Sequence, residues 1–161
     1  MEDLHKIREA ILNSVQNLTD DQLNKVIAEG SWSIAQVLNH LYIMEDNVVH
    51  QIQRALKREA FEEAKPFPLN AIADRTKKIS APDFLMPSDN FQTLEELKVK
   101  LAKSRAALEK LVQETDEEEL NRKTLAHRRF GVLTLSQWIA LVGYHENRHL
   151  GQIEEIKEAL L

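Results

Sequence analysis

The sequence contains no cysteine, little glycine or proline, and no long apolar run. The absence of cysteine from 161 residues excludes catalysis by a thiolate of the protein itself, disulfide bonds and cysteine-ligated zinc. Only four glycines and four prolines interrupt the chain, and the common residues Leu, Ala, Glu, Lys and Gln are good helix formers. The composition therefore predicts an all-α protein, and we expect one domain over residues 1–161.

Two further absences limit the partners that we expect. The formal net charge is -5, which provides no general attraction for nucleic acid or for an anionic membrane. No apolar stretch approaches the roughly 20 residues that cross a bilayer, and the N-terminal residues are acidic and amphipathic, unlike a secretion signal. We therefore expect a cytoplasmic protein that binds neither nucleic acid nor membrane. The basic residues Arg122, Lys123, Arg128 and Arg129 are interpreted as part of a solvated loop.

Apolar residues recur at helical spacing in four segments. These begin near Leu4, after Ser33, after Thr93 and after Thr134, and the second is expected to reach about Ala60. Four capping boxes, in which a Ser or Thr is followed three residues later by Gln or Glu, predict helix starts. They are Thr19–Gln22, Ser33–Gln36, Thr93–Glu96 and Thr134–Gln137. Residues 61–92 and 114–133 lack a sustained period, so we expect connections there, the first of them a lid or a long crossover that packs on the bundle. Within the second connection, Phe130–Gly131 predicts a turn.

Two histidines of the last segment occupy its apolar face. His145 and His149 are one helical turn apart and share a stripe with Trp138, Val142 and Ile153. A buried imidazole without a partner costs about 1–3 kcal/mol, so both rings need one. Neighbouring imidazoles at i and i+4 can bind one metal ion together. The alternative is a pair of histidines hydrogen-bonded to other helices, and the spacing alone leaves both interpretations open.

A third ligand is needed for a useful metal site, and His40 is the best placed. It lies two turns into the second helix but about 100° from the centre of the apolar stripe, so its position alone leaves the assignment open. We interpret the remaining histidines as surface residues: His5, His50 and His127.

Residues 145–149 also read H-E-x-x-H, the pattern of zinc peptidases in which Glu is the general base. No suitable downstream ligand and no strands for a substrate cleft accompany it, so a peptidase is disfavoured. Glu146 is interpreted either as a residue that orients a metal ligand or transfers a proton, or as a solvated flank residue. Glu45 either orients a ligand imidazole or forms an ion pair. Trp32 and Trp138 are interpreted as core anchors.

Two segments resemble the DinB/YfiT-like superfamily. Trp32–Leu41 (WSIAQVLNHL) is similar to the start of the second helix of that family, and Tyr144–Ile153 (YHENRHLGQI) is similar to its H-x-x-x-H-x-G-Q-I segment. The resemblance implies a four-helix bundle of up-down-down-up topology, often dimeric, in which residues 61–92 form the crossover between two parallel helices. It also implies that His40, His145 and His149 are the metal ligands, with zinc or nickel as the expected ion and iron or manganese as alternatives.

The same resemblance implies a metal-dependent transferase that uses a low-molecular-weight thiol, or a hydrolase. Because the chain has no cysteine, the thiol would have to be a separate co-substrate. Glu45 and Glu146 are the candidate catalytic residues. Two alternatives stay open: a homodimer in which a metal ion only stabilises the bundle, and a metal-free bundle whose histidines are hydrogen-bonded.

Overall fold

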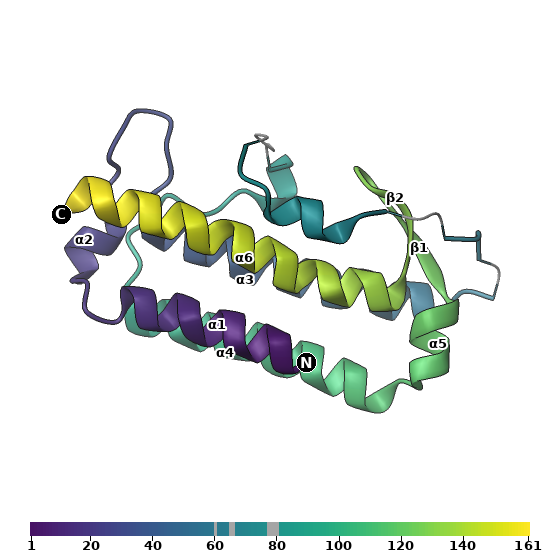
Figure 1. The fold of residues 1–161 in the computed structure, drawn as a ribbon. Coiled ribbons are helices and arrows are strands. Elements are labelled where there is room, and N and C mark those ends of the chain that lie inside the picture. The colour runs from purple at the N-terminus through teal and green to yellow at the C-terminus, as the bar shows by residue number, and fades with distance from the viewer. Residues whose placement is uncertain (60, 65–66, 77–80) are drawn as a thin grey trace.

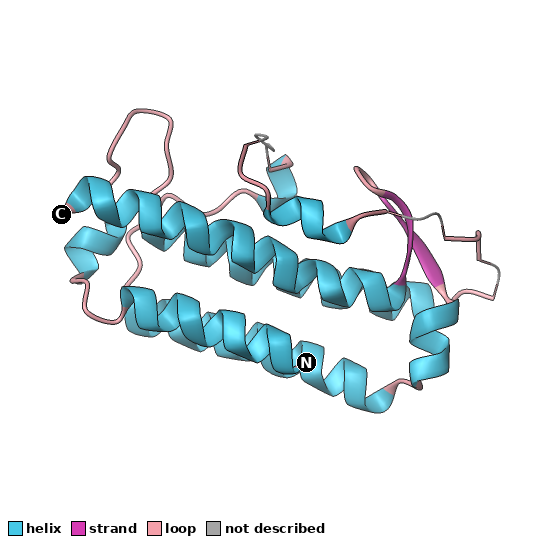
Figure 2. Ribbon diagram, viewed as in Figure 1, coloured by secondary structure: helices cyan, strands magenta, loops and turns pink. Residues whose placement is uncertain are grey.

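The computed structural model describes residues 1–59, 61–64, 67–76 and 81–161, and the expected end of the second helix at Ala60 lies outside them. Secondary structure along the chain is mostly helical (Figure 2). The elements are α1 (Glu2–Val15), α2 (Asp20–Asn24), α3 (Ile34–Leu56), the short 3₁₀ helices η1 (Leu69–Ala73) and η2 (Asp83–Leu85), α4 (Leu94–Glu114), α5 (Glu117–Arg122), β1 (Thr124–His127), β2 (Gly131–Thr134) and α6 (Leu135–Leu160).

The four long helices form a bundle of up-down-down-up topology. Helices α1 and α6 run in one direction, while α3 and α4 run in the other (Figure 1). Parallel neighbours such as α3 and α4 cannot be joined by a tight turn, because the chain has to return along the whole bundle before the second helix begins. The long connection between α3 and α4 makes this return. The expected all-α, four-helix architecture is confirmed.

The four predicted capping boxes are all present and define where α2, α3, α4 and α6 begin. In each, the hydroxyl oxygen accepts from the backbone N–H three residues later, and the side chain of that residue accepts from the cap's own N–H. The cap of α3 is Ser33, whose Oγ accepts from Gln36 N–H at 3.1 Å. Since the start of α3 is fixed in this way, the position of His40 seven residues later on the helix is fixed as well.

The apolar stripes of the helices bury two adjoining sets of side chains. One set fills the end of the bundle where α3 and α4 begin and α1 and α6 end, and it includes Ile11, Leu38, Leu97 and Ile153. The other lies toward the far end and includes Val48, Ile52, Leu108 and Trp138. Burial of this apolar surface supplies the main driving force for assembly of the bundle.

A β-hairpin occupies part of the segment that we expected to be a plain loop. The expectation for residues 114–133 is wrong, because α5, β1 and most of β2 lie within it. The strands pair antiparallel from Thr124↔Thr134 to His127↔Gly131. The predicted turn at Phe130–Gly131 is confirmed: Gly131 has a φ of 78°, a conformation that a residue with a Cβ rarely adopts.

The crossover packs against α6 through η1 and Arg75. A Cβ on Gly151 would lie 2.7 Å from Cδ of Arg75, so glycine at this position makes room for the arginine stem. Arg75 then donates to Glu155 Oε1 and Oε2 at 3.0 and 2.6 Å. These contacts hold the crossover over the middle of α6, as the sequence led us to expect of a connection that covers the bundle.

None of the helices in the described part of the chain combines the length and the hydropathy that a membrane crossing requires.

Candidate metal centre

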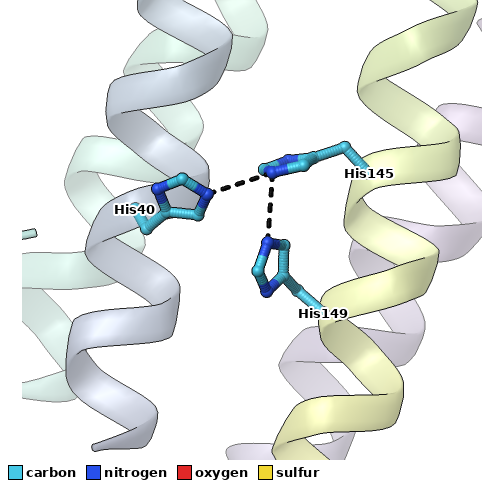
Figure 3. A group of neighbouring side chains, drawn as sticks. All are labelled: His40, His145 and His149. Carbon is cyan, nitrogen blue, oxygen red and sulfur yellow. Dashed lines mark hydrogen bonds between the residues drawn. The ribbon is translucent and has the colours of Figure 1, made fainter. Parts of the chain in front are cut away.

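Three imidazole rings from two helices meet in the bundle. His40 comes from α3, and His145 and His149 come from successive turns of α6 (Figure 3). Nε2 of His145 lies 3.0 Å from Nε2 of His40 and 3.1 Å from Nε2 of His149. One nitrogen from each ring therefore faces a shared point between the helices. The structure brings together the three histidines that the sequence singled out.

The other nitrogen of two of these rings is held by an oxygen atom. His40 Nδ1 donates to the main-chain carbonyl of Leu85 at 2.7 Å, and His149 Nδ1 donates to Oε1 of Gln152 at 2.7 Å. Because each neutral imidazole carries one N–H, the Nε2 atoms of His40 and His149 are left with lone pairs. Both lone pairs point toward Nε2 of His145, which lies between the two rings.

Hydrogen bonds within the protein cannot satisfy this arrangement. Nε2 of His145 carries at most one proton, so it cannot donate separately to both His40 and His149. In addition, Nδ1 of His145 is buried and has no hydrogen-bond partner among the described residues. A neutral imidazole with an unpartnered buried nitrogen is costly. The protein groups alone leave the cluster incompletely paired.

The donor set fits a divalent cation. Nitrogen ligands at 2.0–2.1 Å from a tetrahedral metal lie about 3.3 Å apart, close to the separations of 3.0 and 3.1 Å seen here. All three ligand atoms lie within 4.8 Å of one another. The carbonyl of Leu85 and the side chain of Gln152 are the oxygen acceptors that commonly orient ligand histidines.

Burial keeps the three rings in the neutral form that metal ions require. It lowers the pKa of His40, and the hydrogen bond to Leu85 offsets part of this effect. It lowers the pKa of His149 to about 3, with a further contribution from the positive charge of His40 when that ring is protonated. It also holds the pKa of His145 well below its usual range. Protons therefore compete weakly with a cation for these nitrogens near neutral pH.

The histidines line a cavity of about 980 Å³, which we call the histidine cavity. Its walls come from α3, α6, the crossover and the hairpin, and they include Trp32, Phe84, His127 and Arg148. The ring of Trp32 lies 5.0 Å from that of His40 and 6.4 Å from that of His149. A cavity of this size accommodates a small organic molecule next to the three imidazoles. Trp138 also lines the histidine cavity. Its indole Nε1 donates to the main-chain carbonyl of Leu125 at 3.0 Å, as expected of a core anchor.

The candidate catalytic residues Glu45 and Glu146 belong to a separate buried ion cluster. Glu45 accepts from Arg8 at 3.0 Å and from Arg105 at 2.7 Å, and Glu146 accepts from the same two arginines. Ser104 Oγ donates to Glu45 at 2.5 Å. The ion-pair interpretation of Glu45 is confirmed. A catalytic role for either carboxylate stays a prediction.

Glu146 is not a solvated flank residue, because it is 1% exposed. Burial raises its pKa, although the two arginine charges oppose that shift. The solvated-flank interpretation is wrong because the apolar stripe of α6 gives no sign that Arg8 and Arg105 cross the bundle to meet this carboxylate.

His127 is the site residue that sequence reasoning missed. We interpreted His5, His50 and His127 as surface residues, and the structure exposes the first two but places His127 on β1 in the cavity wall. Its ring stacks on Phe130 with centroids 4.5 Å apart and lies 4.9 Å from Trp138. The turn at Phe130–Gly131 is the signal that could have located it. Two strands paired across that turn place His127 opposite Gly131.

The sequence and the structure were compared with those of known proteins. Residues 3–153 match the sequence model of the DinB superfamily. The uncharacterized protein YuaE of Bacillus subtilis is 34% identical over 148 residues, which cover 92% of this chain and 91% of that protein. A protein of Oceanobacillus iheyensis named "Putative metal-dependent hydrolase OB0413" is 26% identical over 142 residues, covering 88% and 73%.

Two solved structures share the fold. The four-helix bundle protein TT2238 has a TM-score of 0.65 at 23% identity and covers 96% of this chain and 94% of its own. YfiT from Bacillus subtilis, described as "a probable metal-dependent hydrolase with an unusual four-helix bundle topology", has a TM-score of 0.62 at 19% identity, with 98% and 83% coverage. At these identities the likeness establishes the bundle architecture alone.

Proposed function

The chain belongs to the DinB superfamily, and from this premise we propose that it is a metal-dependent enzyme acting on a small molecule in the histidine cavity. His40, His145 and His149 would hold one divalent ion, with zinc or nickel as the expected metal. The observation that carries the proposal is the convergence of three Nε2 atoms that the protein's own hydrogen bonds cannot satisfy. The name of the relative OB0413 and the description of YfiT agree with it.

The site favours a catalytic ion over a structural one. Three protein ligands leave at least one coordination position free, whereas structural zinc sites are closed by four. The three imidazoles also line a cavity of about 980 Å³, in which a substrate can approach them. A metal ion held there supplies Lewis acidity, which lowers the pKa of a thiol or a water molecule at the open position.

The residues of this chain would bind and orient the reactants. The carbonyl of Leu85 and Gln152 fix the His40 and His149 rings, so the ligand nitrogens keep their direction while substrates exchange. Trp32 and Trp138 provide apolar walls that exclude water from one side of the cavity. A transferase of this kind takes its thiol from solution because the chain has no cysteine, and a hydrolase uses water at the same position.

The first experiment measures metal content. Protein purified without a histidine tag is analysed for zinc, nickel, iron and manganese beside His149→Ala and the matched control His50→Ala, whose ring is exposed on α3. We expect about one ion per chain in the parent and the control, and little in His149→Ala. Equal metal content in the parent and His149→Ala contradicts the proposal.

A second experiment separates the two reactions. The metal-loaded protein is incubated with 1-chloro-2,4-dinitrobenzene plus a small thiol, and separately with p-nitrophenyl acetate. Thiol transfer forms a sulfur–carbon bond and releases chloride, while the thiol proton goes to solvent. Activity that needs the thiol supports the transferase, and activity on the ester alone supports the hydrolase. Loss of stability on chelation without turnover of either substrate favours the structural role of the metal.

A further inference from the structure

The lining of the histidine cavity is more basic than the chain as a whole. Four arginines and two carboxylates line it, although acidic residues outnumber basic ones in the sequence and the net charge is -5. The arginines come from the crossover, the hairpin and α6. They are Arg75, Arg128, Arg129 and Arg148. The cavity therefore concentrates positive charge although the net charge of the protein is negative, and this favours an anionic occupant.

Two of these arginines form hydrogen bonds or ion pairs with other residues of the protein. Arg75 forms an ion pair with Glu155 at 2.6 Å. Arg148 donates to the main-chain carbonyl of Ile72 at 3.3 Å and to that of Asp74. Arg128 and Arg129, which follow β1 at the end of the hairpin, differ from them. Both are exposed, and neither forms an ion pair with any residue that the structure describes.

The hairpin arginines lie near other positive groups in the cavity wall. Burial and then the charges of Arg128 and Arg129 lower the pKa of His127 to about 4. Arg148 contributes a further guanidinium group to the same wall. Like charges held close together around a partly apolar cavity repel one another, and a bound anion would relieve this repulsion.

His127 adds a neutral hydrogen-bond donor to the same wall. Its Nδ1 accepts from the main-chain N–H groups of Arg129 and Phe130 at 3.0 and 3.2 Å. The hydrogen of the neutral ring must therefore be on Nε2. Contacts with Phe130 and Trp138 hold the ring in place. The hairpin end thus combines two exposed guanidinium groups, free of ion pairs with the described residues, with one fixed imidazole N–H.

We propose that His127, Arg128 and Arg129 form a subsite that binds an oxyanion group of the substrate while its reactive atom lies at the three histidines. This inference rests on the proposed function for the position of the reactive atom, but the subsite itself is built from hairpin residues. Guanidinium groups bind carboxylates and phosphates through paired, charge-assisted hydrogen bonds, which neutral isosteres cannot form. The substrate of the enzyme is accordingly an anionic small molecule.

The test compares two thiols of similar size, 3-mercaptopropionate and 3-mercapto-1-propanol, which differ in a single carboxylate. Binding is followed by fluorescence, because the two tryptophans of the chain both line the cavity. The proteins are the parent, Arg128→Gln/Arg129→Gln, and the matched control Arg54→Gln/Arg58→Gln, which removes two exposed charges outside the cavity. Metal content is measured on each sample.

We expect the metal-loaded parent and the control to bind the carboxylate about tenfold more tightly than the alcohol. In Arg128→Gln/Arg129→Gln this preference falls to about twofold or less, while the affinity for the alcohol and the metal content are unchanged. Equal affinities in the parent, or a preference retained in the hairpin variant, overturn the subsite and leave the metal site standing. If the parent binds no metal, the proposed function fails, and the same titrations on the metal-free protein still decide the oxyanion preference.

Discussion

The bundle contains two buried polar clusters side by side, and they differ in how completely the protein satisfies them. The ion cluster joins Glu45 and Glu146 to Arg8 and Arg105, so two carboxylates face two guanidinium groups. The histidine cluster comes from α3 and α6, the two helices that also carry Glu45 and Glu146, and His145 directly precedes Glu146. Its three Nε2 atoms face one another without enough protons to pair them.

The difference indicates separate roles. A cluster whose charges balance inside the protein holds helices in register and needs nothing from outside. A cluster of converging lone pairs needs a partner from outside the protein, and we propose that a cation from solution completes it. The candidate catalytic glutamates thus contact arginines of α1 and α4, whereas the three candidate ligand histidines line the cavity.

The largest expected effect comes from breaking the ion cluster. Glu45 has no exposed side-chain surface, so Glu45→Gln leaves Arg8 and Arg105 with only one carboxylate between them. We expect the free energy of unfolding, measured by urea denaturation of the metal-free protein, to fall by about 3–5 kcal/mol. The control Glu95→Gln removes an exposed partner of Lys98, and we expect a change below about 0.5 kcal/mol. Similar effects of the two variants would contradict a structural role for the ion cluster.

Removal of the metal should have the next largest effect. An ion present at about 100 times its dissociation constant stabilises the folded state by roughly 3 kcal/mol. We therefore expect chelation to lower the melting temperature of the parent and of His50→Ala by several degrees. In His149→Ala chelation should change little, since the site has lost one ligand. A variant that responds to chelator as strongly as the parent would place the ion elsewhere.

A pH titration of stability tests the burial of His127. Its folded pKa of about 4 lies below the ordinary value of 6.5, so the unfolded chain binds more protons between these two values. Its contribution to stability is therefore fully present above about pH 6.5 and is lost as the pH falls toward 4. In metal-free protein we expect His127→Gln to flatten the fall of the unfolding free energy over this range relative to the parent. Parallel profiles for the parent and His127→Gln would contradict the burial of His127.

The smallest effect is expected where the crossover meets α6. In Gly151→Ala the new methyl group displaces Arg75, while the gain in helix propensity offsets part of the loss, so stability changes by less than about 1 kcal/mol. The local signature is the pKa of Glu155, which the hydrogen bond from Arg75 now lowers. Carboxyl NMR should show that pKa rising toward its ordinary value in the variant. An unchanged pKa would mean that Arg75 keeps its place.

Local sequence signals predicted the helices well. The four capping boxes fix the starts of α2, α3, α4 and α6 through hydrogen bonds that span only three residues, so the sequence contains all the participants. The pair His145 and His149 was likewise visible, because both lie on one apolar face. His40, off the centre of its stripe, required the family resemblance to be chosen.

The missed features depend on contacts between distant segments. Strands of four residues such as β1 and β2 are too short to show a period, so the sequence indicates only a surface position for His127. The burial of Glu146 depends on Arg8, 138 residues away, and on Arg105. Arg75 contacts α6 only because the crossover between α3 and α4 passes over that helix. No local sequence pattern predicts these contacts.

The central claim is that His40, His145 and His149 bind one cation together, and X-ray absorption spectroscopy of the nickel- or zinc-loaded protein tests it most directly. We predict a first shell that contains three imidazole nitrogens at about 2.0–2.1 Å, with one imidazole lost in His40→Ala. A shell with fewer than three imidazoles in the parent, or one unchanged by His40→Ala, would contradict the claim.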